Sequence, residues 1–407
     1  MTKYLPGLLL VLLPFFVHSQ ENPEIISWIV NTEAETGYNG ITSNVQSVDY
    51  TANDVYVSCT CIPGYDIGPW AGNPNTPSNQ NFVFKITRNP QQNNGNLIAT
   101  PLGHIGVWTN GVSIFNAKDA FSYNNQNVWF QNAIVVEGPS FDLCGGHPAP
   151  NGEYHHLNPS CIYDVSDDDM HSPIIGYAFD GFPIYGAHAY LNTDGTGGIA
   201  RMKSSYRLRD ITSRTTLPDG SLAANAGPLV SEDYPLGYYI EDYEFMEGLG
   251  DLDEFNGRFC VTPEYPDGTY AYFCTVDENF EAEYPYVIGP NYYGTIQNGN
   301  TGPQSGHNII PGDAENWSPN SVSELSTVNL TVYPNPCGDR LNLSSSLLSG
   351  FILKLCIYSV DGKLIQEEIV HGNFYSYEIN TSTLEAGSYI LQVMTINGLF
   401  AHTILKQ

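Results

Sequence analysis

The residues best suited to chemistry lie close together, between positions 142 and 188. Five of the ten histidines in the chain fall within this stretch. The candidate metal ligands are His147, His155, His156 and His171. Imidazole nitrogens combined with a carboxylate suit Zn or Cu. The supporting residues that we expect near such a site are Asp142, Tyr154 and Asp180.

The two adjacent histidines of this group cannot do the same work in a regular strand. Residues 154–157 read Tyr-His-His-Leu, and successive side chains of a strand point to opposite faces. We therefore expect His155 and His156 to point to opposite faces. Both reach one metal only if the Asn-Pro pair at 158–159 ends the strand or a bulge turns one of them.

Other interpretations of these residues stay open. One alternative is that the histidines are structural groups that hydrogen-bond the backbone of a loop-rich fold, and another is that one of them acts as a general base without metal. Asp180 either makes a turn with Gly181 or orients His171 or a ligand. The sequence has no nucleophile elbow, HExxH helix, phosphate-binding loop or dinucleotide fingerprint. It therefore gives no motif for a serine hydrolase or a nucleotide-binding enzyme.

Two acidic clusters offer oxygen ligands for Ca²⁺. They span residues 165–172 and 241–258, and neither has the spacing of an EF-hand loop. The calcium candidates that we rank first are Asp251, Asp253 and Glu254. The alternative is a solvated acidic loop that binds no metal.

The N-terminus and the charge indicate where the protein works. Residues 1–19 hold Lys3, an apolar run and a small residue, Ser19, which is the pattern of a signal peptide. The run is too short to span a bilayer comfortably, so we expect a secreted or cell-surface protein with no transmembrane segment in the mature chain. The alternative is a membrane anchor. With 43 acidic and 14 basic residues, the net charge of -29 argues against nucleic acid and anionic membranes as partners.

An exported chain favours disulfides over metal thiolates for its eight cysteines. The sequence cannot fix the connectivity, because eight cysteines allow about 105 pairings. Proximity favours three pairs: Cys144 with Cys161, Cys260 with Cys274, and Cys337 with Cys356. A direct bond between Cys59 and Cys61 would be strained, so these two pair elsewhere or stay reduced.

The composition favours a mostly β fold. Charged residues make up only 14% of the chain, while Gly, Pro and Tyr are plentiful, which favours strands and turns. We expect a β-rich body with long irregular loops at 20–293 and a linker at 294–326. Alternating apolar residues and an Asp-Gly turn then predict a small antiparallel β-sandwich at 327–407.

Within the body, one segment has a clear strand pattern. Residues 174–179 read as a buried strand, Asp180-Gly181 as a turn and residues 182–185 as a returning apolar segment. Because Pro183 removes a ladder hydrogen bond, we expect this return to be an edge or irregular segment.

Three segments of the tail carry a specific resemblance. They are LTVYPNPCGDRLNL (330–343), IYSVDGKLI (357–365) and LEAGSYILQV (384–393), before a chain end of ILKQ. They resemble the type IX secretion C-terminal sorting domain (type A) of Bacteroidota. The resemblance implies the type IX secretion machinery as a partner, export through the periplasm and outer membrane, removal of the tail and attachment to surface lipopolysaccharide. The alternative is an adhesive or carbohydrate-binding sandwich.

The body resembles a second family. The segments are NGVSIFN (110–116), DLCGGHPAPNGEYHHLNPSCIYD (142–164), HSPIIGYAFDGFPIYG (171–186), LDEFNGRFC (252–260) and YPYVIG (284–289). They resemble the YHYH domain family, which implies no established activity. The chain departs from the Tyr-His-Tyr-His motif, because it reads Tyr-His-His-Leu at 154–157 and Tyr-Ala-Tyr-Phe at 270–273.

Two function classes follow from these patterns. The first is a secreted metal-binding protein or metalloenzyme with its ligands among the histidines above. The second is a non-enzymatic extracellular binding or adhesion module for a glycan or protein ligand. For that class the contact candidates are Trp70, Trp108 and Trp129, each of which is otherwise a core residue.

Overall fold

The chain folds mostly into β-strands, as expected. The computed structural model describes residues 22–157, 160–163, 170–302, 304–318, 331–344, 352–359, 363–369, 376–395 and 398–407. We refer to its described residues before 319 as the body and to those from 331 as the tail. The signal-peptide pattern at 1–19 lies outside the described residues. Within them, we find no helix that is both long and apolar enough to cross a membrane.

The helices are short. The α-helices are α1 (Pro23–Ile26) and α2 (Ala133–Glu137), and the 3-10 helices are η1 (Tyr38–Gly40), η2 (Tyr123–Asn125), η3 (Gly138–Ser140) and η4 (Ile240–Asp242). Of these, α2 and η3 bear on function, because they follow each other directly beside the candidate site.

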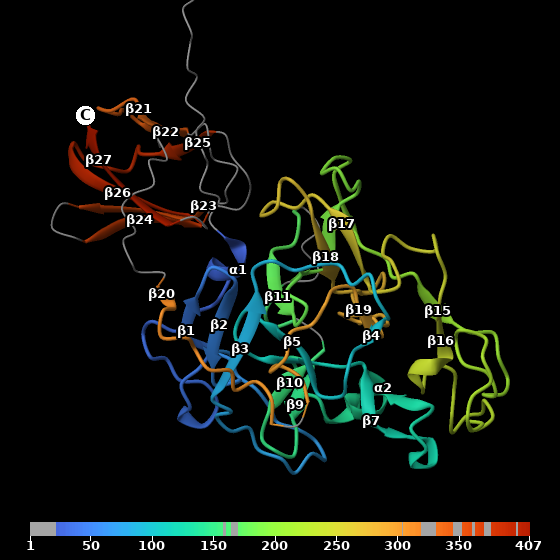
Figure 1. The fold of residues 1–407 in the computed structure, drawn as a ribbon. Coiled ribbons are helices and arrows are strands. Elements are labelled where there is room, and N and C mark those ends of the chain that lie inside the picture. Colours follow the sequence, from blue (N-terminus) through green and yellow to red (C-terminus); the bar gives the residue numbers. More distant parts are fainter. Residues whose placement is uncertain are drawn as a thin grey trace, which may run out of the picture.

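An eight-stranded sheet is the largest in the body (Figure 1). Its strand order is β17-β18-β12-β11-β5-β6-β10-β9. The strands are β5 (His104–Trp108), β6 (Ser113–Phe115), β9 (Gly146–Pro148), β10 (Tyr154–His156), β11 (Ile174–Ala178), β12 (Pro183–Tyr185), β17 (Gly257–Cys260) and β18 (Thr269–Phe273). Neighbours are antiparallel except for the parallel pairs β6–β10 and β12–β18.

The two faces of this sheet pack against different partners. A four-stranded sheet, β20-β1-β2-β3, shares one apolar cluster with Val107 and Tyr177 of the large sheet. Its strands are β1 (Val45–Tyr50), β2 (Asp54–Cys59), β3 (Phe82–Thr87) and β20 (Glu315–Trp317). Trp108 and Ala178, the next residues along β5 and β11, belong instead to a second cluster that loop residues such as Tyr292 complete. Alternation along the strands thus buries both faces.

The two halves of the large sheet repeat one pattern. Residues 105–115 and 175–185 both begin with Ile-Gly, continue with Asn-Gly or Asp-Gly at the same spacing, and end with Ile and an aromatic residue. Each forms an antiparallel hairpin, β5–β6 or β11–β12. The hairpins meet at the pair Val107–Tyr177, with equivalent residues paired on either side. An approximate two-fold axis therefore passes through this pair.

The outer strands follow the same repeat. In one half β10 lies parallel to β6 and pairs with β9, and in the other β18 lies parallel to β12 and pairs with β17. In each half an aspartate accepts hydrogen bonds from a tyrosine hydroxyl and from the N–H groups two and four residues further on. These are Asp142 with Tyr154, and Asp253 with Tyr270.

The return segment of the second hairpin was expected to be an edge or irregular segment, and its pairing with β11 is indeed interrupted by a register shift. β12 lies between β18 and β11 inside the sheet, so it is not an edge strand. Pro183 is tolerated because it is the first residue of that strand, where a missing N–H costs little. The predicted buried strand and the Asp180-Gly181 turn are present as β11 and its connection to β12.

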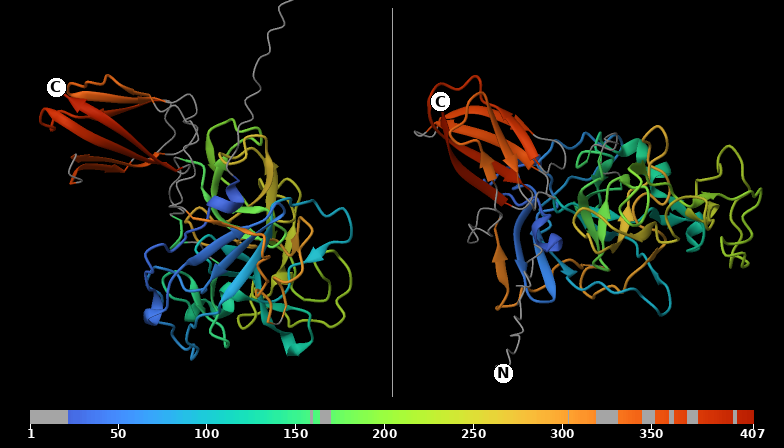
Figure 2. Two further views of the ribbon diagram at one scale, coloured as in Figure 1. Left: turned by 60° about the vertical axis from the view of Figure 1, so that its left-hand side comes forward. Right: turned by 90° about the horizontal axis from the view of Figure 1, so that it is seen from above.

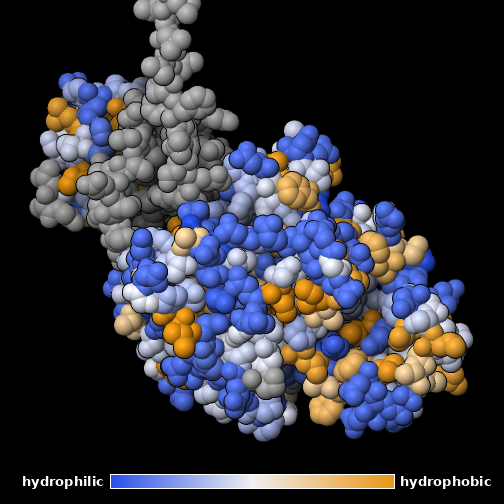
Figure 3. Space-filling view, viewed as in Figure 1, coloured by the Kyte–Doolittle hydropathy of each residue, from blue (hydrophilic) through white to orange (hydrophobic). Residues whose placement is uncertain are grey.

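Four short strand pairs and long loops complete the body (Figure 2). They are β4 (Ile98–Ala99) with β19 (Asn291–Tyr292), β7 (Lys118–Ser122) with β8 (Phe130–Asn132), β13 (His188–Tyr190) with β14 (Ile199–Arg201), and β15 (Tyr206–Leu208) with β16 (Tyr243–Phe245). The loop between β15 and β16 has its own anchor, because Arg214 makes two 2.7 Å contacts with the Asp242 carboxylate and both side chains are fully buried. The face in Figure 3 is largely hydrophilic, with small apolar patches.

The segment expected to be a linker pairs and hydrogen-bonds with strands of the four-stranded sheet. Residues 315–317 form β20, which pairs with β1, and Asn300 exchanges two hydrogen bonds with the backbone of Lys85. Polar side chains of this segment therefore satisfy strand edges, which composition alone does not reveal. Residues 319–326 lie outside the described residues.

The tail is the expected β-sandwich. One sheet contains β21 (Thr331–Tyr333), β22 (Arg340–Ser344) and β25 (Ser376–Asn380), and the other contains β23 (Ile352–Ser359), β24 (Leu364–Ile369), β26 (Gly387–Thr395) and β27 (Gly398–Lys406). Leu341 and Leu343 of the first sheet share a core with Leu355 and Leu391 of the second. The predicted Asp-Gly turn at 361–362 lies outside the described residues, but β23 and β24 on either side of it pair as expected.

Candidate metal centre

Two of the predicted histidines meet a carboxylate at one edge of the large sheet. His147 on β9 lies directly opposite His155 on β10, and their ring centroids are 4.9 Å apart. Glu137, the last residue of α2, places Oε2 3.5 Å from Nε2 of His147. One ligand atom from each of the three residues lies within 4.8 Å of the others. The group is compact enough for a single ion to bind with small side-chain adjustments.

Neighbouring groups fix how the two imidazoles present their nitrogens. The Ser140 hydroxyl donates to the carbonyl of Glu137, so it accepts from Nδ1–H of His147 at 2.8 Å. Nδ1–H of His155 donates to the Glu153 carbonyl at 3.2 Å. Both rings therefore keep an Nε2 lone pair for a ligand. Metal-binding histidines are usually held in this way through their second nitrogen.

The surroundings keep His155 neutral and rigid. Burial, together with the adjacent His147, lowers the pKa of His155 to about 4, and metal binding requires the neutral imidazole. The ring of Phe115 stacks on that of His155 with centroids 3.7 Å apart. The Glu137 side chain is 29% exposed, whereas that of His147 is 9% exposed. The group is therefore open to solvent on the Glu137 side.

A second carboxylate belongs to the same neighbourhood. Burial, and then the charge of Glu137, raises the pKa of Asp119 on β7 to about 6. An acid that titrates near neutral pH beside a metal can exchange protons with a bound water. No motif in the sequence marks Asp119 or Glu137, because both come from β7 and α2, outside the histidine-rich stretch.

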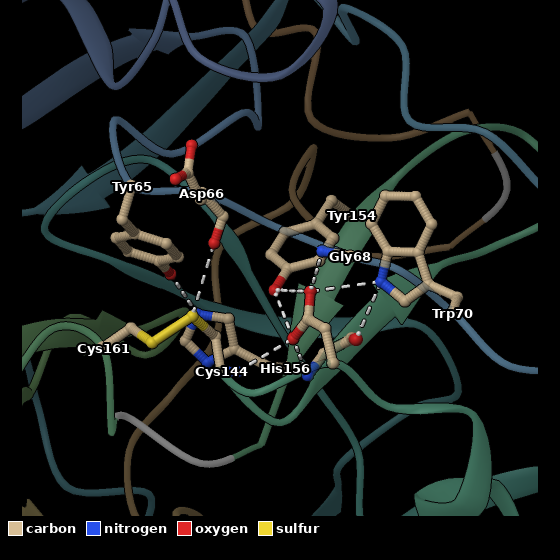
Figure 4. Close-up of a disulfide and its surroundings, with 10 residues drawn as sticks. Tyr65, Asp66, Gly68, Trp70, Cys144, Tyr154, His156 and Cys161 are labelled. Atoms are coloured by element: carbon tan, nitrogen blue, oxygen red, sulfur yellow. Dashed lines mark hydrogen bonds between the residues drawn. A yellow bond between two sulfur atoms is a disulfide. The ribbon is translucent and has the colours of Figure 1, made fainter.

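His156 lies on the other face of β10 and does not join this group. Its ring stacks on Trp108 with centroids 5.3 Å apart, and its Nε2 lies 3.0 Å from the hydroxyl of Tyr65. Figure 4 shows Tyr65 and His156 beside the disulfide. Strand alternation, as argued from the sequence, separates the two adjacent histidines, since β10 continues through His156 without a bulge.

Asp142 holds backbone and side chains rather than a ligand. Its carboxylate accepts from the N–H of Gly68, the indole of Trp70 and the hydroxyl of Tyr154. These three partners are labelled in Figure 4. It also accepts from two backbone N–H groups of its own loop. With its lone pairs used in this way, Asp142 supports the β9–β10 hairpin instead of supplying a metal ligand.

The disulfide expected between Cys144 and Cys161 is present, with Cα atoms 5.3 Å apart. The expected Cys260–Cys274 pair is wrong, because both are free and buried. Cys260 lies opposite Thr269 on β18, so Cys274 is five residues further along that strand, about 16 Å away at ~3.3 Å per residue. The remaining cysteines are free and buried as well: Cys59, Cys61, Cys337 and Cys356.

His171 and Asp180 are not part of the three-residue group, and each has its own partners. Nδ1–H of His171 donates to the Ser172 carbonyl at 2.7 Å, and its ring contacts Tyr185 and Tyr190. Asp180 accepts from the Tyr272 hydroxyl and from the N–H groups of residues 182 and 294. Asp180 therefore makes its turn, and the structure gives it no contact with His171.

The calcium candidates also have structural partners. Asp253 is held by Tyr270 and its own loop, as described above, and Asp251 accepts from the N–H of Lys203. Glu254 is exposed, and its backbone carbonyl accepts from the hydroxyl of Tyr206. In the part of the chain that the structure describes, Glu137, His147 and His155 form the one group that brings three ligand atoms together.

The tryptophans proposed as ligand contacts are largely core residues. Trp108 and Trp129 are 0% exposed. Trp70 is partly exposed, and its indole N–H is directed to Asp142.

Comparison with known proteins assigns both parts of the chain. Residues 83–285 match the family model described as YHYH protein. The body of this chain is a YHYH domain. Residues 331–407 match the secretion system C-terminal sorting domain, so the protein is exported by type IX secretion to the cell surface or beyond. A comparison with curated proteins found no match. All three residues of the compact group lie within the YHYH match.

Proposed function

We propose that this exported YHYH protein binds one transition-metal ion through Glu137, His147 and His155. The observation that carries the proposal is the convergence of one carboxylate and two imidazole nitrogens within 4.8 Å. Two of the three come from directly opposed strand positions and the third from the adjoining helix. The support of both rings through Nδ1 leaves both Nε2 atoms for a ligand, which is how metal-binding histidines are usually held.

The internal repeat separates structural residues from those with another role. The Asp–Tyr pair of each half recurs, so it serves the hairpin. The cross-strand histidines do not recur, because the equivalent directly opposed pair is Arg258 and Ala271. Since the fold forms in the second half without these histidines, stability of the hairpin does not explain His147 and His155.

The ligand set favours Zn or Cu. Two nitrogens and one carboxylate oxygen suit both ions, and three protein ligands leave a position for water or another ligand. Asp119 would then be a proton acceptor near that water. A hydrolytic metalloenzyme and a metal-binding surface protein both fit this arrangement, and we propose metal binding as the shared property.

Metal analysis of the purified full-length chain tests the proposal. After incubation with Zn²⁺ or Cu²⁺ and removal of the excess, we expect about one ion per chain. His147→Gln and His155→Gln should each abolish retention, and Ser140→Ala should weaken affinity about 10–100-fold through loss of the second-nitrogen contact. His156→Gln is the matched control, because it changes the adjacent histidine on the opposite face and should keep the ion.

Two outcomes would contradict the proposal. One is a wild-type chain that retains neither ion. The other is equal retention by the wild type and the His147→Gln/His155→Gln double variant, with circular dichroism showing that both are folded.

We also propose that the tail is removed on export and that the body becomes attached to lipopolysaccharide, as the resemblance of the tail implies. Mass spectrometry of the exported protein tests this. A surface form that retains residues 331–407 and carries no lipopolysaccharide would refute it.

A further inference from the structure

Three side chains that are distant in the sequence form a hydrogen-bonded row outside the metal group. Nε2 of His104, at the start of β5, lies 2.9 Å from the hydroxyl of Ser305. Nδ1 of the same ring lies 2.8 Å from Oε1 of Glu153. Ser305 belongs to the segment that the sequence predicted as a linker. The row is thus a serine, a histidine and a carboxylate in direct contact.

Burial increases along this row from the serine to the acid. Ser305 is partly exposed, His104 is 8% exposed and Glu153 is 4% exposed. The rings of Phe82, Phe84 and Phe179 surround His104 edge-on, with centroids 5.4, 5.4 and 5.7 Å away. These rings shield the imidazole from water on its flanks, while the serine stays within reach of a ligand.

The loop around the serine turns sharply. Gln304, directly before it, has φ of 58°, and Gly306, directly after it, has φ of 79°. A side chain is unfavourable at such angles, so the loop is held there by its surroundings. Gly306 is anchored on β3, where its carbonyl accepts from the N–H of Val83.

We propose that Ser305, His104 and Glu153 form a catalytic triad for acyl transfer, with esters as the substrate class. A nucleophile within hydrogen-bond reach of a base, which a third group orients, is the signature of this chemistry. Glu153 holds Nδ1–H of His104, so Nε2 is the basic nitrogen that faces the Ser305 hydroxyl. Uncharged esters are favoured, because the net charge of -29 repels anionic substrates.

The reaction balances in two steps. The Ser305 oxygen bonds to the ester carbonyl carbon while its proton passes to Nε2 of His104. The bond to the leaving alcohol breaks, and His104 returns the proton to that oxygen. Water then adds to the acyl-serine with His104 again as the base, which releases the acid and restores the serine.

The loop limits how reactive this serine can be. The N–H groups of Ser305 and Gly306 already donate to the carbonyls of Gly302 and Gly299. The Ser305 hydroxyl itself donates to the carbonyls of Gly302 at 2.7 Å and Asn300 at 3.1 Å, so it has to turn toward Nε2 of His104 before it can react. A missing oxyanion donor costs about 10²–10³ in rate. We therefore expect reaction with activated esters and phosphonyl fluorides, and not with amides.

The test uses a fluorophosphonate probe on the full-length chain, with mass spectrometry to locate the label. We expect the label on Ser305 and none in Ser305→Ala. His104→Gln should lower the labelling rate by about 100-fold or more, the usual contribution of a general base. Ser231→Ala changes a more exposed serine elsewhere in the chain and should label as the wild type does. EDTA should have no effect, which separates this site from the proposed metal centre.

The proposal is overturned if the folded wild-type chain is not labelled, or if the label lies elsewhere. It is also overturned if His104→Gln, shown to be folded by circular dichroism, labels at the wild-type rate. A lower melting temperature of Ser305→Ala without any labelling of the wild type would mean that the three groups only fasten the loop to the body.

Discussion

Acid should destabilise the body through His171, and the structure gives the size of the effect. Its side chain is buried, and its Nε2 has no hydrogen-bond partner among the residues that the structure describes. Burial first, and then the positive charge of Arg258, lowers the pKa of His171 to about 4 from the usual 6.5, although the bond to Ser172 opposes the shift. In the unfolded chain the ring takes up its proton near pH 6.5. The folded state therefore loses stability as the pH falls from 6.5 toward 4.

The magnitude follows from the difference between the two pKa values. At about 1.36 kcal/mol per unit, the stability that His171 contributes above pH 6.5 falls by about 3 kcal/mol at pH 4. His171→Asn keeps a donor near the position of Nδ1 but cannot take up a proton. The wild type should therefore lose about 3 kcal/mol more than this variant between pH 7 and pH 4.

Urea unfolding followed by tryptophan fluorescence measures this difference. All five tryptophans precede residue 331, so the signal reports the body and not the tail. Subtracting the variant from the wild type at each pH cancels the titration of all other groups. His307→Asn, a histidine near the surface, is the control and should follow the wild type. Parallel pH profiles for wild type and His171→Asn would refute the reasoning.

Three further effects can be measured by the same unfolding assay. Replacing Cys144 and Cys161 by alanine removes a disulfide that spans a sequence separation of 17 residues. The free energy of unfolding should fall by about 3 kcal/mol, because the unfolded chain regains the entropy of the open loop. An unchanged free energy of unfolding after reduction of the wild type would argue against this. Asp242→Asn leaves the buried Arg214 guanidinium without a charged partner and should lower the free energy of unfolding by about 3–5 kcal/mol. A decrease below about 1 kcal/mol would show that water solvates the guanidinium in the variant. Tyr270→Phe removes a hydrogen bond to the partly buried carboxylate of Asp253 and should lower the free energy of unfolding by about 1.5–3 kcal/mol. An unchanged midpoint would contradict the structural role given to the repeated Asp–Tyr pair.

Local patterns in the sequence were sufficient for much of the fold. The alternation around residues 353–358 and 388–393 identified the tail sandwich, because a strand with one buried face must alternate. Residues 174–181 likewise showed a buried strand and its turn. The repeat between 105–115 and 175–185 is also visible in the residues, and its Ile-Gly and Asn-Gly or Asp-Gly spacing was the signal that could have revealed it.

Where the prediction failed, the cause was contact between distant segments. Cys260 and Cys274 are close in the sequence, but the extended strand β18 separates them. They lie at opposite ends of the β17–β18 strand pair. Residues 294–318 look like a linker by composition, yet their backbone pairs with β1 and a polar side chain satisfies the backbone of β3. Composition describes what a segment contains and not what lies beside it.

The candidate site divides in the same way. The sequence by itself determined the export signals of the tail, the β-rich class and the separation of His155 from His156, because each depends on neighbours along the chain. Only the tertiary structure selected His147 and His155 from the histidines, supplied Glu137 as their carboxylate, and brought His104, Glu153 and Ser305 together. Those choices depend on strand pairing and loop packing between residues that the sequence leaves far apart.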